Sequence, residues 1–415
     1  MKILYVVHQF YPMHHTGTEK FLLNLSTTMQ KWGNRVKVLA YSFYDDSFYS
    51  SGESNLLTKE FSYKGIEVFA FKYRAYPPGF GYALEDPNIR PFAESFLRKE
   101  NPDIIHVAHP MRMGEFIHAA IRLHIPYVIT MTDFWLMCPK AILYTSKNTL
   151  CMGPEKGMAC KNYCPEYDHD SISHRLKLSE QIFHNASSVI APSRFLARLF
   201  KTEFQFLEPK FIPYGIDFAY IKRNNRLYDG TGDFVVMYAG QIEYHKGVHI
   251  LIDAFKHLKG ENLRLKLYGS GPEKTVRIFQ EMAKDDRRIE FCGVYEENQI
   301  GEIFGKVDIA VIPSNWHENN TITMREALAC HVPCVVSSAG GMMEKIQNGV
   351  NGFVFRMGDA VHLREVLEEV ITRPELFQRM KKNLRSYSLT TAEQEAYAYE
   401  RVYQEQLRDG SGKNI

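Results

Sequence analysis

The sequence lacks any unbroken apolar stretch of the roughly 18 residues that a membrane-spanning helix needs. It also lacks an excess of charge of either sign, since 50 Lys and Arg residues stand against 48 Asp and Glu residues and leave a formal net charge of +2. The first absence argues against a membrane-spanning chain, and the second gives no global electrostatic reason to expect nucleic acid as a partner. The N-terminal apolar run, Ile3 to Val7, is too short for a signal peptide, so we expect a cytoplasmic protein.

The chain is long enough for two domains. Its 415 residues exceed what one hydrophobic core usually organises, so we expect two domains of roughly 200 residues each. Hydrophobic residues make up 45% and charged residues 24% of the chain, values typical of globular proteins, which argues against a disordered or fibrous chain.

Short apolar runs alternate with amphipathic stretches in both halves of the chain. The runs that we interpret as strands are 3–7, 36–40, 104–107, 127–130 and 189–191 in the first half, and 234–239, 265–268, 289–292, 309–312 and 335–337 in the second. This alternation is typical of βαβ units, and unbroken apolar runs indicate parallel strands that are buried on both faces. We therefore expect an α/β fold with two doubly wound sheets, which bind ligands at the carboxyl ends of their strands.

Two breaks in this alternation suggest the domain limits. The first, residues 137–170, is rich in Cys, Lys, Gly and Pro and is interpreted as an insertion loop. The second, residues 223–233, carries the Asn-Asn and Asp-Gly-Thr-Gly-Asp sequences of a linker. We expect an N-terminal domain over 1–225, a C-terminal domain over 226–390, and a C-terminal helix over 391–415 that can pack on either domain, the N-terminal one being favoured.

Two carboxylates eight positions apart follow the run that ends at Ile312. Glu318 is expected in a strand-to-helix loop, and Glu326 on the first turns of a helix that begins near Thr323. Carboxylates accept hydrogen bonds from sugar hydroxyls, and a helix N-terminus offers backbone N–H groups to phosphate. On spacing alone, an alternative without a ligand is equally favoured. In it, Glu318 is a solvated loop residue, and Glu326 is a charge near a helix N-terminus that the helix dipole stabilises.

The stretch from Pro313 to Ala329, with the pattern PS-x-W-x-E…EALA, resembles the signature of the retaining family 4 glycosyltransferases of the GT-B fold. Other segments fall in the order found in that family: Thr16-Gly17-Thr18-Glu19, Asp103-Ile104-Ile105-His106, Asp133-Phe134-Trp135, Ala191-Pro192-Ser193, Gly240-Gln241, Lys246-Gly247, Tyr268-Gly269-Ser270-Gly271-Pro272 and Gly340-Gly341. The resemblance covers nearly the whole chain. It implies two Rossmann-like domains facing a central cleft, and transfer of a hexosyl or other glycosyl group with retained configuration.

The resemblance also implies a substrate class. The donor is a nucleotide-sugar, UDP- or GDP-linked, and the acceptor is a saccharide or a lipid-linked molecule, as in the synthesis of surface polysaccharides and glycoconjugates. No cofactor is implied for catalysis, because a lysine, a helix N-terminus and backbone amides can neutralise the diphosphate. Two alternatives remain, a nucleotide-sugar epimerase on the same fold and a non-catalytic nucleotide-sugar-binding subunit.

The same resemblance assigns roles to individual residues. The catalytic set is Lys246 at the diphosphate, Glu318 near the donor sugar, Asp133 on the acceptor side and His109 as the imidazole of the N-terminal domain. The residues assigned to donor binding are Gly17, Gln241, Lys246, Gly269, Val294, Ile322, Thr323 and Glu326.

The chain departs from the usual family pattern at several of these positions. Ala108 and Thr132 stand where the family often has histidine. His109 is therefore one residue away from the expected position. For both His109 and His106, a structural role explains the residue as well as a catalytic role does. Thr16 replaces the first of two glycines. Gln241 replaces an arginine and brings a hydrogen-bond donor without a charge.

Four of the seven cysteines, Cys138, Cys151, Cys160 and Cys164, fall in the insertion loop. A cytosolic protein rarely contains disulfides, and four thiolates can hold a structural zinc ion, although paired C-x-x-C motifs are missing. Thiols that pack as small hydrophobic groups are the alternative.

A short basic helix suggests a second surface. Residues 194–201 place basic side chains beside Phe195, Leu199 and Phe200, an arrangement that can bring the protein into peripheral contact with the inner face of a membrane.

Overall fold

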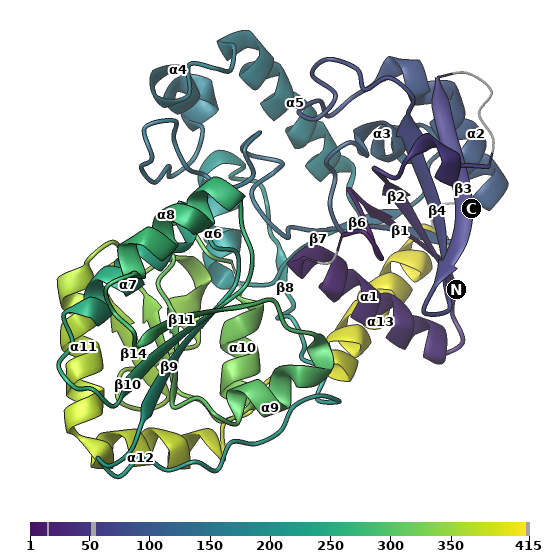
Figure 1. Cartoon of the computed structure of the whole chain (residues 1–415). Coiled ribbons are helices and arrows are strands. Elements are labelled where there is room, and N and C mark those ends of the chain that lie inside the picture. Colours follow the sequence, from purple (N-terminus) through teal and green to yellow (C-terminus); the bar gives the residue numbers. More distant parts are fainter. Residues whose placement is uncertain (15, 51–54, 320, 412–415) are drawn as a thin grey trace. The chain divides into compact units, whose positions relative to one another are not determined.

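Strand β1 (Lys2–Val7) alternates its side chains between two apolar clusters, Leu4 and Val6 on one side and Ile3, Tyr5 and Val7 on the other. A strand buried on both faces lies inside a sheet that is covered by helices on both sides. The computed structural model, which describes residues 1–14, 16–50, 55–319 and 321–411, shows such a sheet in the N-terminal part of the chain (Figure 1).

This sheet has the order β3-β4-β2-β1-β5-β6-β7-β8. All neighbours are parallel except β3 and β4, which form an antiparallel hairpin. The remaining strands are β2 (Arg35–Tyr41), β3 (Leu56–Tyr63), β4 (Ile66–Tyr73), β5 (Ile104–Val107), β6 (Tyr127–Thr130), β7 (Ser188–Ala191) and β8 (Lys210–Phe211).

The sheet belongs to a compact unit that we call the N-terminal unit, formed by Met1–Gly215 together with Ala392–Ile415. Its helices are α1 (Gly17–Lys31), α2 (Arg90–Glu100), α3 (Gly114–Arg122), α4 (Met158–Tyr163), α5 (His169–Asn185), α6 (Arg194–Glu203) and α13 (Ala392–Ser411). Helix α1 begins with a capping box, in which Glu19 Oε2 accepts hydrogen bonds from Thr16 N at 2.7 Å and Thr16 Oγ1 at 2.6 Å.

Helix α13 completes the core of the N-terminal unit beside α1 (Figure 1). Its side chains Ala396, Tyr399 and Tyr403 are fully buried in the same cluster as β1. The Tyr403 hydroxyl lies 2.6 Å from His106 Nδ1, and the Tyr399 hydroxyl lies 2.9 Å from Thr130 Oγ1, which in turn lies 2.8 Å from His106 Nε2. His106 therefore has both ring nitrogens engaged and belongs to the packing of α13 on β5 and β6.

The second compact unit, Ile216–Thr391, is called the C-terminal unit. Its parallel sheet has the order β11-β10-β9-β12-β13-β14, the strand order of a Rossmann fold. The strands are β9 (Phe234–Ala239), β10 (Leu263–Tyr268), β11 (Ile289–Gly293), β12 (Ile309–Ile312), β13 (Cys334–Ser337) and β14 (Gly352–Phe355), and the helices are α7 (Val248–Lys256), α8 (Glu273–Ala283), α9 (Ile300–Phe304), α10 (Ile322–Ala329), α11 (Ala360–Thr372) and α12 (Pro374–Leu384). The expected pair of Rossmann-like α/β domains is confirmed.

Each sheet has one point where the strand order reverses direction. In the C-terminal unit it lies between β9 and β12, and in the N-terminal unit between β1 and β5. Loops leaving the carboxyl ends of two such strands diverge to opposite faces and leave room for a ligand between them. These two points position the candidate site residues.

Candidate active site

The loops after β9 and β12 meet at the reversal point of the C-terminal unit. The Asn315 backbone N–H donates to the His245 carbonyl at 2.8 Å, and Thr323 Oγ1 donates to the Ala239 carbonyl at 3.0 Å. Lys246, from the first loop, places its Nζ 2.8 Å from Oε1 of Glu318, from the second loop. The structure thus brings together two of the predicted catalytic residues.

Glu318 is held as a buried carboxylate. Its side chain is only 8% exposed, and its Oε1 accepts hydrogen bonds from Lys246 Nζ, from Ser314 Oγ at 2.7 Å and from Trp316 Nε1 at 2.8 Å. Burial alone raises the pKa of Glu318, but the charge of Lys246 and these three hydrogen bonds outweigh burial and hold the pKa below its usual value. The group is therefore ionised at neutral pH.

Lys246 is fixed from a second direction. Its Nζ lies 4.4 Å from the centre of the Trp316 ring, in addition to the ion pair with Glu318. The side chain is 19% exposed, so the ammonium group lies close to the surface of the carboxyl edge. A single cation is thereby oriented before any ligand arrives.

Helix α10 begins at Ile322, one residue before the expected start at Thr323. Ile322 and Thr323 are half-buried and lie in its first turn, where backbone N–H groups have no partner within the helix. Glu326, one turn further, is buried and acts electrostatically on Tyr295, whose pKa is raised by burial and further by this carboxylate. Tyr295 follows Val294 in the loop after β11, so the loop and α10 lie within electrostatic range of each other.

Two glycines let backbone segments approach closely in this region. Gly269 has φ +133°, and a Cβ added there would lie 1.8 Å from the carbonyl oxygen of Gly240. Gly340 has φ +64°, and its Cβ would lie 1.9 Å from the carbonyl oxygen of Glu318. A side chain at position 269 would displace the loop that carries Gln241, and a side chain at position 340 would displace the loop that carries Glu318.

The other residues predicted to bind the donor lie at the edges of the two units. Gln241 is exposed after β9, and Val294 is 70% exposed after β11. Gly17 is exposed at the first position of α1, in the N-terminal unit. Each follows a strand of its own sheet at the carboxyl edge.

In the N-terminal unit, His109 and Asp133 form a direct pair. The Met111 backbone N–H donates to His109 Nδ1 at 3.2 Å, so the ring proton resides on Nε2, which donates to Asp133 Oδ2 at 2.7 Å. Asp133 Oδ1 also accepts from the Trp135 backbone N–H at 2.8 Å. Because both nitrogens of His109 are engaged, the residue orients Asp133, whose side chain is 28% exposed.

Two residues near this pair were not found from the sequence. The His8 ring packs against the His109 ring, with the centroids 4.0 Å apart and the planes tilted by 37°, and its Nε2 lies 3.5 Å from Glu19 Oε1. Arg112 donates from Nη2 to the His8 carbonyl at 3.2 Å. Burial, followed by the charges around it, lowers the pKa of His8 well below its usual value, so the ring is neutral. The signal that could have revealed His8 is its position directly after β1.

The four cysteines of the insertion loop line one small pocket in the N-terminal unit. Within the described ranges, however, no three His, Cys, Asp or Glu side chains are arranged closely enough to hold a metal ion. The described part of the chain therefore contains no preformed zinc site, and the expectation of zinc gains no support from ligand geometry there.

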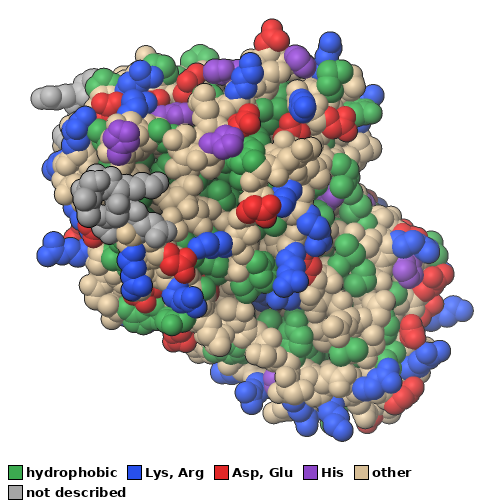
Figure 2. Space-filling model, turned by 180° about the vertical axis from the view of Figure 1, so that it is seen from behind, with side chains coloured by type: hydrophobic (Ala, Val, Ile, Leu, Met, Phe, Trp, Pro, Cys, Tyr) green, Lys and Arg blue, Asp and Glu red, His purple; other side chains and the backbone are tan. Residues whose placement is uncertain are grey.

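The expectation of membrane contact is not supported either. Leu199 and Phe200 of α6 are buried in the core of the N-terminal unit, so the apolar face of this helix packs against protein. Among the described residues, no helix combines the length and the apolar character that a bilayer crossing requires. On the face shown in Figure 2, basic and acidic side chains are interspersed.

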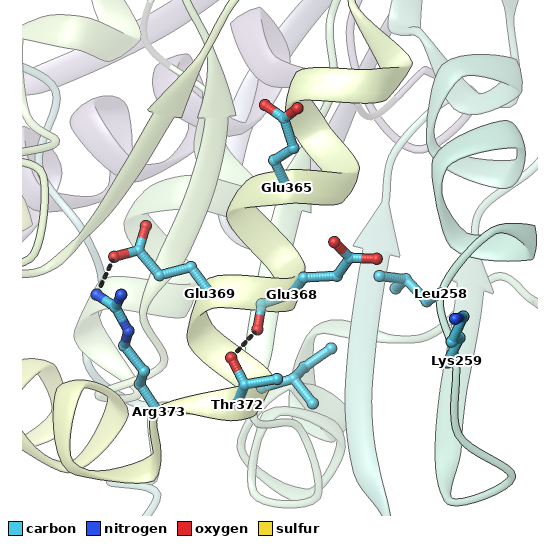
Figure 3. A pocket seen from close by; sticks show the side chains of 8 residues that line it. Leu258, Lys259, Glu365, Glu368, Glu369, Thr372 and Arg373 are labelled. Atoms are coloured by element: carbon cyan, nitrogen blue, oxygen red, sulfur yellow. Dashed lines mark hydrogen bonds and ion pairs between the residues drawn. The ribbon is translucent and has the colours of Figure 1, made fainter.

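A hollow at the opposite edge of the C-terminal sheet is separate from this site. It lies where α7 and α11 end, between Leu258 and Lys259 on one side and three glutamates of α11 on the other (Figure 3). Glu369 pairs with Arg373 at 2.9 Å. Helices that follow parallel strands end at the amino edge of a sheet, so this hollow faces away from Lys246 and Glu318.

Comparison with known proteins matches both units. The family model described as Glycosyltransferase Family 4 matches residues 15–220, and the model described as Glycosyl transferases group 1 matches residues 223–387. The N-acetyl-alpha-D-glucosaminyl L-malate synthase of Bacillus anthracis is 22% identical over 243 residues, which are 57% of this chain and 61% of that protein. The chain thus spans less than two thirds of the length of this relative.

Two solved structures share the fold over almost the whole chain. HepE from Anabaena, in complex with UDP and glucose, has a TM-score of 0.69 at 18% identity and covers 97% of this chain and 99% of its own. Sucrose-phosphate synthase from Thermosynechococcus elongatus has a TM-score of 0.71 at 16% identity and covers 98% of this chain and 99% of its own.

Proposed function

Because the chain belongs to the GT-B glycosyltransferases of group 1 and family 4, we propose that it transfers a sugar from a nucleotide-sugar to a saccharide or lipid-linked acceptor with retained anomeric configuration. The observation that carries this proposal is the ion pair between Lys246 and Glu318 beside the N-terminus of α10, at the reversal point of a Rossmann-like sheet. HepE, which shares the fold, is described in complex with UDP-glucose, and this favours a UDP-sugar as the first donor to test.

Lys246 is proposed to bind the donor diphosphate. An oriented ammonium group stabilises the negative charge that develops on the leaving phosphate, and such preorganised groups lower barriers strongly. The first N–H groups of α10, at Ile322 and Thr323, add neutral donors to the same phosphates. Glu318 orients Lys246 and accepts hydrogen bonds from hydroxyl groups of the sugar. Glu326 accepts hydrogen bonds from the ribose hydroxyls. The remaining contacts with the nucleotide-sugar come from Gly17, Gln241, Gly269 and Val294.

Asp133 is proposed to contact the acceptor. It is the exposed member of the pair with His109, so its carboxylate can accept a hydrogen bond from the acceptor hydroxyl while the imidazole holds it in place. His109 acts as a positioning residue in this proposal, because both of its ring nitrogens are engaged in hydrogen bonds, with Asp133 and with the Met111 backbone.

The chemical step is proposed to be a same-face displacement. The bond between the anomeric carbon and the phosphate oxygen breaks, the acceptor oxygen bonds to the anomeric carbon from the same side, and the hydroxyl proton passes to the departing phosphate. A nucleoside diphosphate and the glycoside are the products. We place this reaction in the cytoplasm, in the synthesis of surface polysaccharide or another glycoconjugate.

The test is to incubate the purified protein with UDP-, GDP- and ADP-sugars in turn, with and without candidate saccharide and lipid acceptors, while donor binding and nucleotide release are both followed. Release that requires an acceptor supports a transferase, and NMR of the product then tests retention. Conversion of donor into an isomeric sugar without acceptor indicates the epimerase instead. Binding without turnover across the whole acceptor panel favours the non-catalytic subunit.

A further inference from the structure

The four cysteines of the insertion loop converge although they are spread along 27 residues of sequence. Cys138, Cys151, Cys160 and Cys164 line the same small pocket, and the sulfur of Cys160 lies within electrostatic range of the other three. Cys138, Cys160 and Cys164 are buried, while Cys151 is half-buried. All seven cysteines of the chain lie in described residues and are thiols rather than disulfides.

The polypeptide around this pocket has little regular structure to hold it. Between β6 and α5 the described chain forms one isolated bridge, Tyr144 to Leu150, a single turn of 3-10 helix and the short helix α4. Backbone hydrogen bonds from Lys140 and Leu143 reach the Cys138 sulfur. Burial outweighs these two amides and raises the pKa of the Cys138 thiol, so the amides orient the sulfur while it remains protonated in the metal-free protein.

A buried cation stands beside the pocket without an anionic partner. Arg175 on α5 is 6% exposed, donates to the carbonyls of Tyr82 and Trp135, and lies over the Trp135 ring at 4.3 Å. Burial lowers the pKa of Arg175 to about 10, and the groups within electrostatic range of it include the Cys138 thiol and the Asp133 carboxylate, neither of which forms an ion pair with it in the part of the chain that the structure describes. A buried charge without a counter-charge is strongly unfavourable, so the surroundings of Arg175 call for negative charge at the pocket.

We propose that Cys138, Cys151, Cys160 and Cys164 bind one thiophilic metal ion, zinc in the first instance, and that this metal fixes the insertion loop. Binding replaces four S–H bonds by four Zn–S bonds and releases four protons, and the product carries two negative charges that offset Arg175. Because no preformed ligand set exists in the described structure, the sulfurs close on the ion as it binds. The inference is independent of the proposed transferase function.

The experiment is metal analysis of protein purified under reducing conditions, followed by chelation and titration with zinc. We expect about one zinc ion per wild-type chain, as for a closed four-cysteine site. Cys151→Ser, at the half-buried position, should lose the metal, whereas Cys292→Ser, outside the loop, should retain it. Chelation should lower the thermal midpoint of the wild type and of Cys292→Ser and leave that of Cys151→Ser unchanged.

The results that would overturn the proposal are equally definite. Less than about 0.2 metal ion per chain, both as purified and after incubation with zinc, would exclude the site, as would full binding by Cys151→Ser. Iron with equimolar sulfide and visible absorption would support the four-thiolate site with an iron–sulfur cluster in place of zinc. If Cys151→Ser fails to fold, protection of four thiols from alkylation by added zinc in the wild type gives the same answer.

Discussion

The Nζ of Lys246 lies 2.8 Å from Oε1 of Glu318, a residue that also binds Ser314 and Trp316 through the same oxygen. The cation that the proposed reaction requires is therefore held in place by a buried carboxylate before the donor binds. In the proposed complex, the donor diphosphate binds a Lys246 that is already paired with Glu318.

Replacing Lys246 by alanine should slow turnover much more than it weakens donor binding. Loss of one preorganised donor to a developing anion costs about 3–4 kcal/mol of barrier height, which is on the order of 100- to 1,000-fold in kcat. Steady-state kinetics with saturating donor measure this effect. Lys259→Ala, at the opposite edge of the same sheet, is the matched control and should leave kcat unchanged; an equal effect of both substitutions would remove Lys246 from the site.

Replacing Glu326 by alanine should weaken donor binding and leave kcat largely intact. Hydrogen bonds from hydroxyls to a carboxylate contribute about 1.5–3 kcal/mol, so the Kd for the donor should rise roughly 10- to 100-fold. Isothermal titration calorimetry with the nucleoside diphosphate and with the full donor measures the Kd. Glu273→Ala, on an exposed helix turn of the same unit, is the control. An unchanged Kd would contradict the ribose contact.

Asp133→Asn should lower turnover at saturating donor without changing donor affinity, because the residue is proposed to bind the acceptor. His109→Gln should produce a smaller loss in the same direction, since it removes only the group that orients Asp133. Initial rates with varied acceptor measure both variants. Asp170→Asn, whose side chain is 98% exposed, is the control. A raised donor Kd in Asp133→Asn would instead place this residue at the donor.

Acid should destabilise the protein through His106. Burial lowers the pKa of His106 to about 3, whereas the unfolded residue titrates near 6.5. Between these values the unfolded chain binds an extra proton, so stability falls as pH falls, by about 1.6 kcal/mol between pH 6.5 and 5 for this residue. Urea unfolding at several pH values measures the slope. His106→Gln should flatten it and His257→Gln, an exposed residue, should not; equal slopes in all three proteins would rule out this contribution.

Tyr403→Phe should destabilise the N-terminal unit. It removes the hydroxyl that lies 2.6 Å from His106 Nδ1 and leaves a buried nitrogen without a partner, at a cost of about 1–3 kcal/mol. The urea midpoint reports the change. Tyr397→Phe, at a position that is 59% exposed on the same helix, should leave the midpoint within error; a matching loss there would mean that the network around His106 contributes nothing specific.

Much of the fold could be predicted from periodicity. The unbroken apolar runs 3–7 and 234–239 are central parallel strands, and the helix expected to begin near Thr323 begins at Ile322. The hairpin of β3 and β4 was missed because its strands alternate polar and apolar residues, although Lys64-Gly65, both with positive φ, form a recognisable turn.

The pairings within the site could not be predicted in the same way. Lys246 and Glu318 are 72 residues apart in sequence, and only the meeting of the β9 and β12 loops brings them together. The membrane surface expected on α6 gains no support from the structure for a related reason, since a local pattern of basic and apolar residues does not tell which face of the helix the core covers. His8 carries no motif and is significant only through its place after β1.

The packing of α13 against β5 and β6 sets an order of events during protein synthesis. His106 meets its partner 297 residues later in the chain, after the whole of the C-terminal unit has been made. Helix α1 already covers part of this face of the first sheet, but the apolar surface that α13 covers stays exposed while the ribosome translates the second unit. Stalled or prematurely terminated chains expose this apolar surface, and exposed apolar surface of this kind favours aggregation.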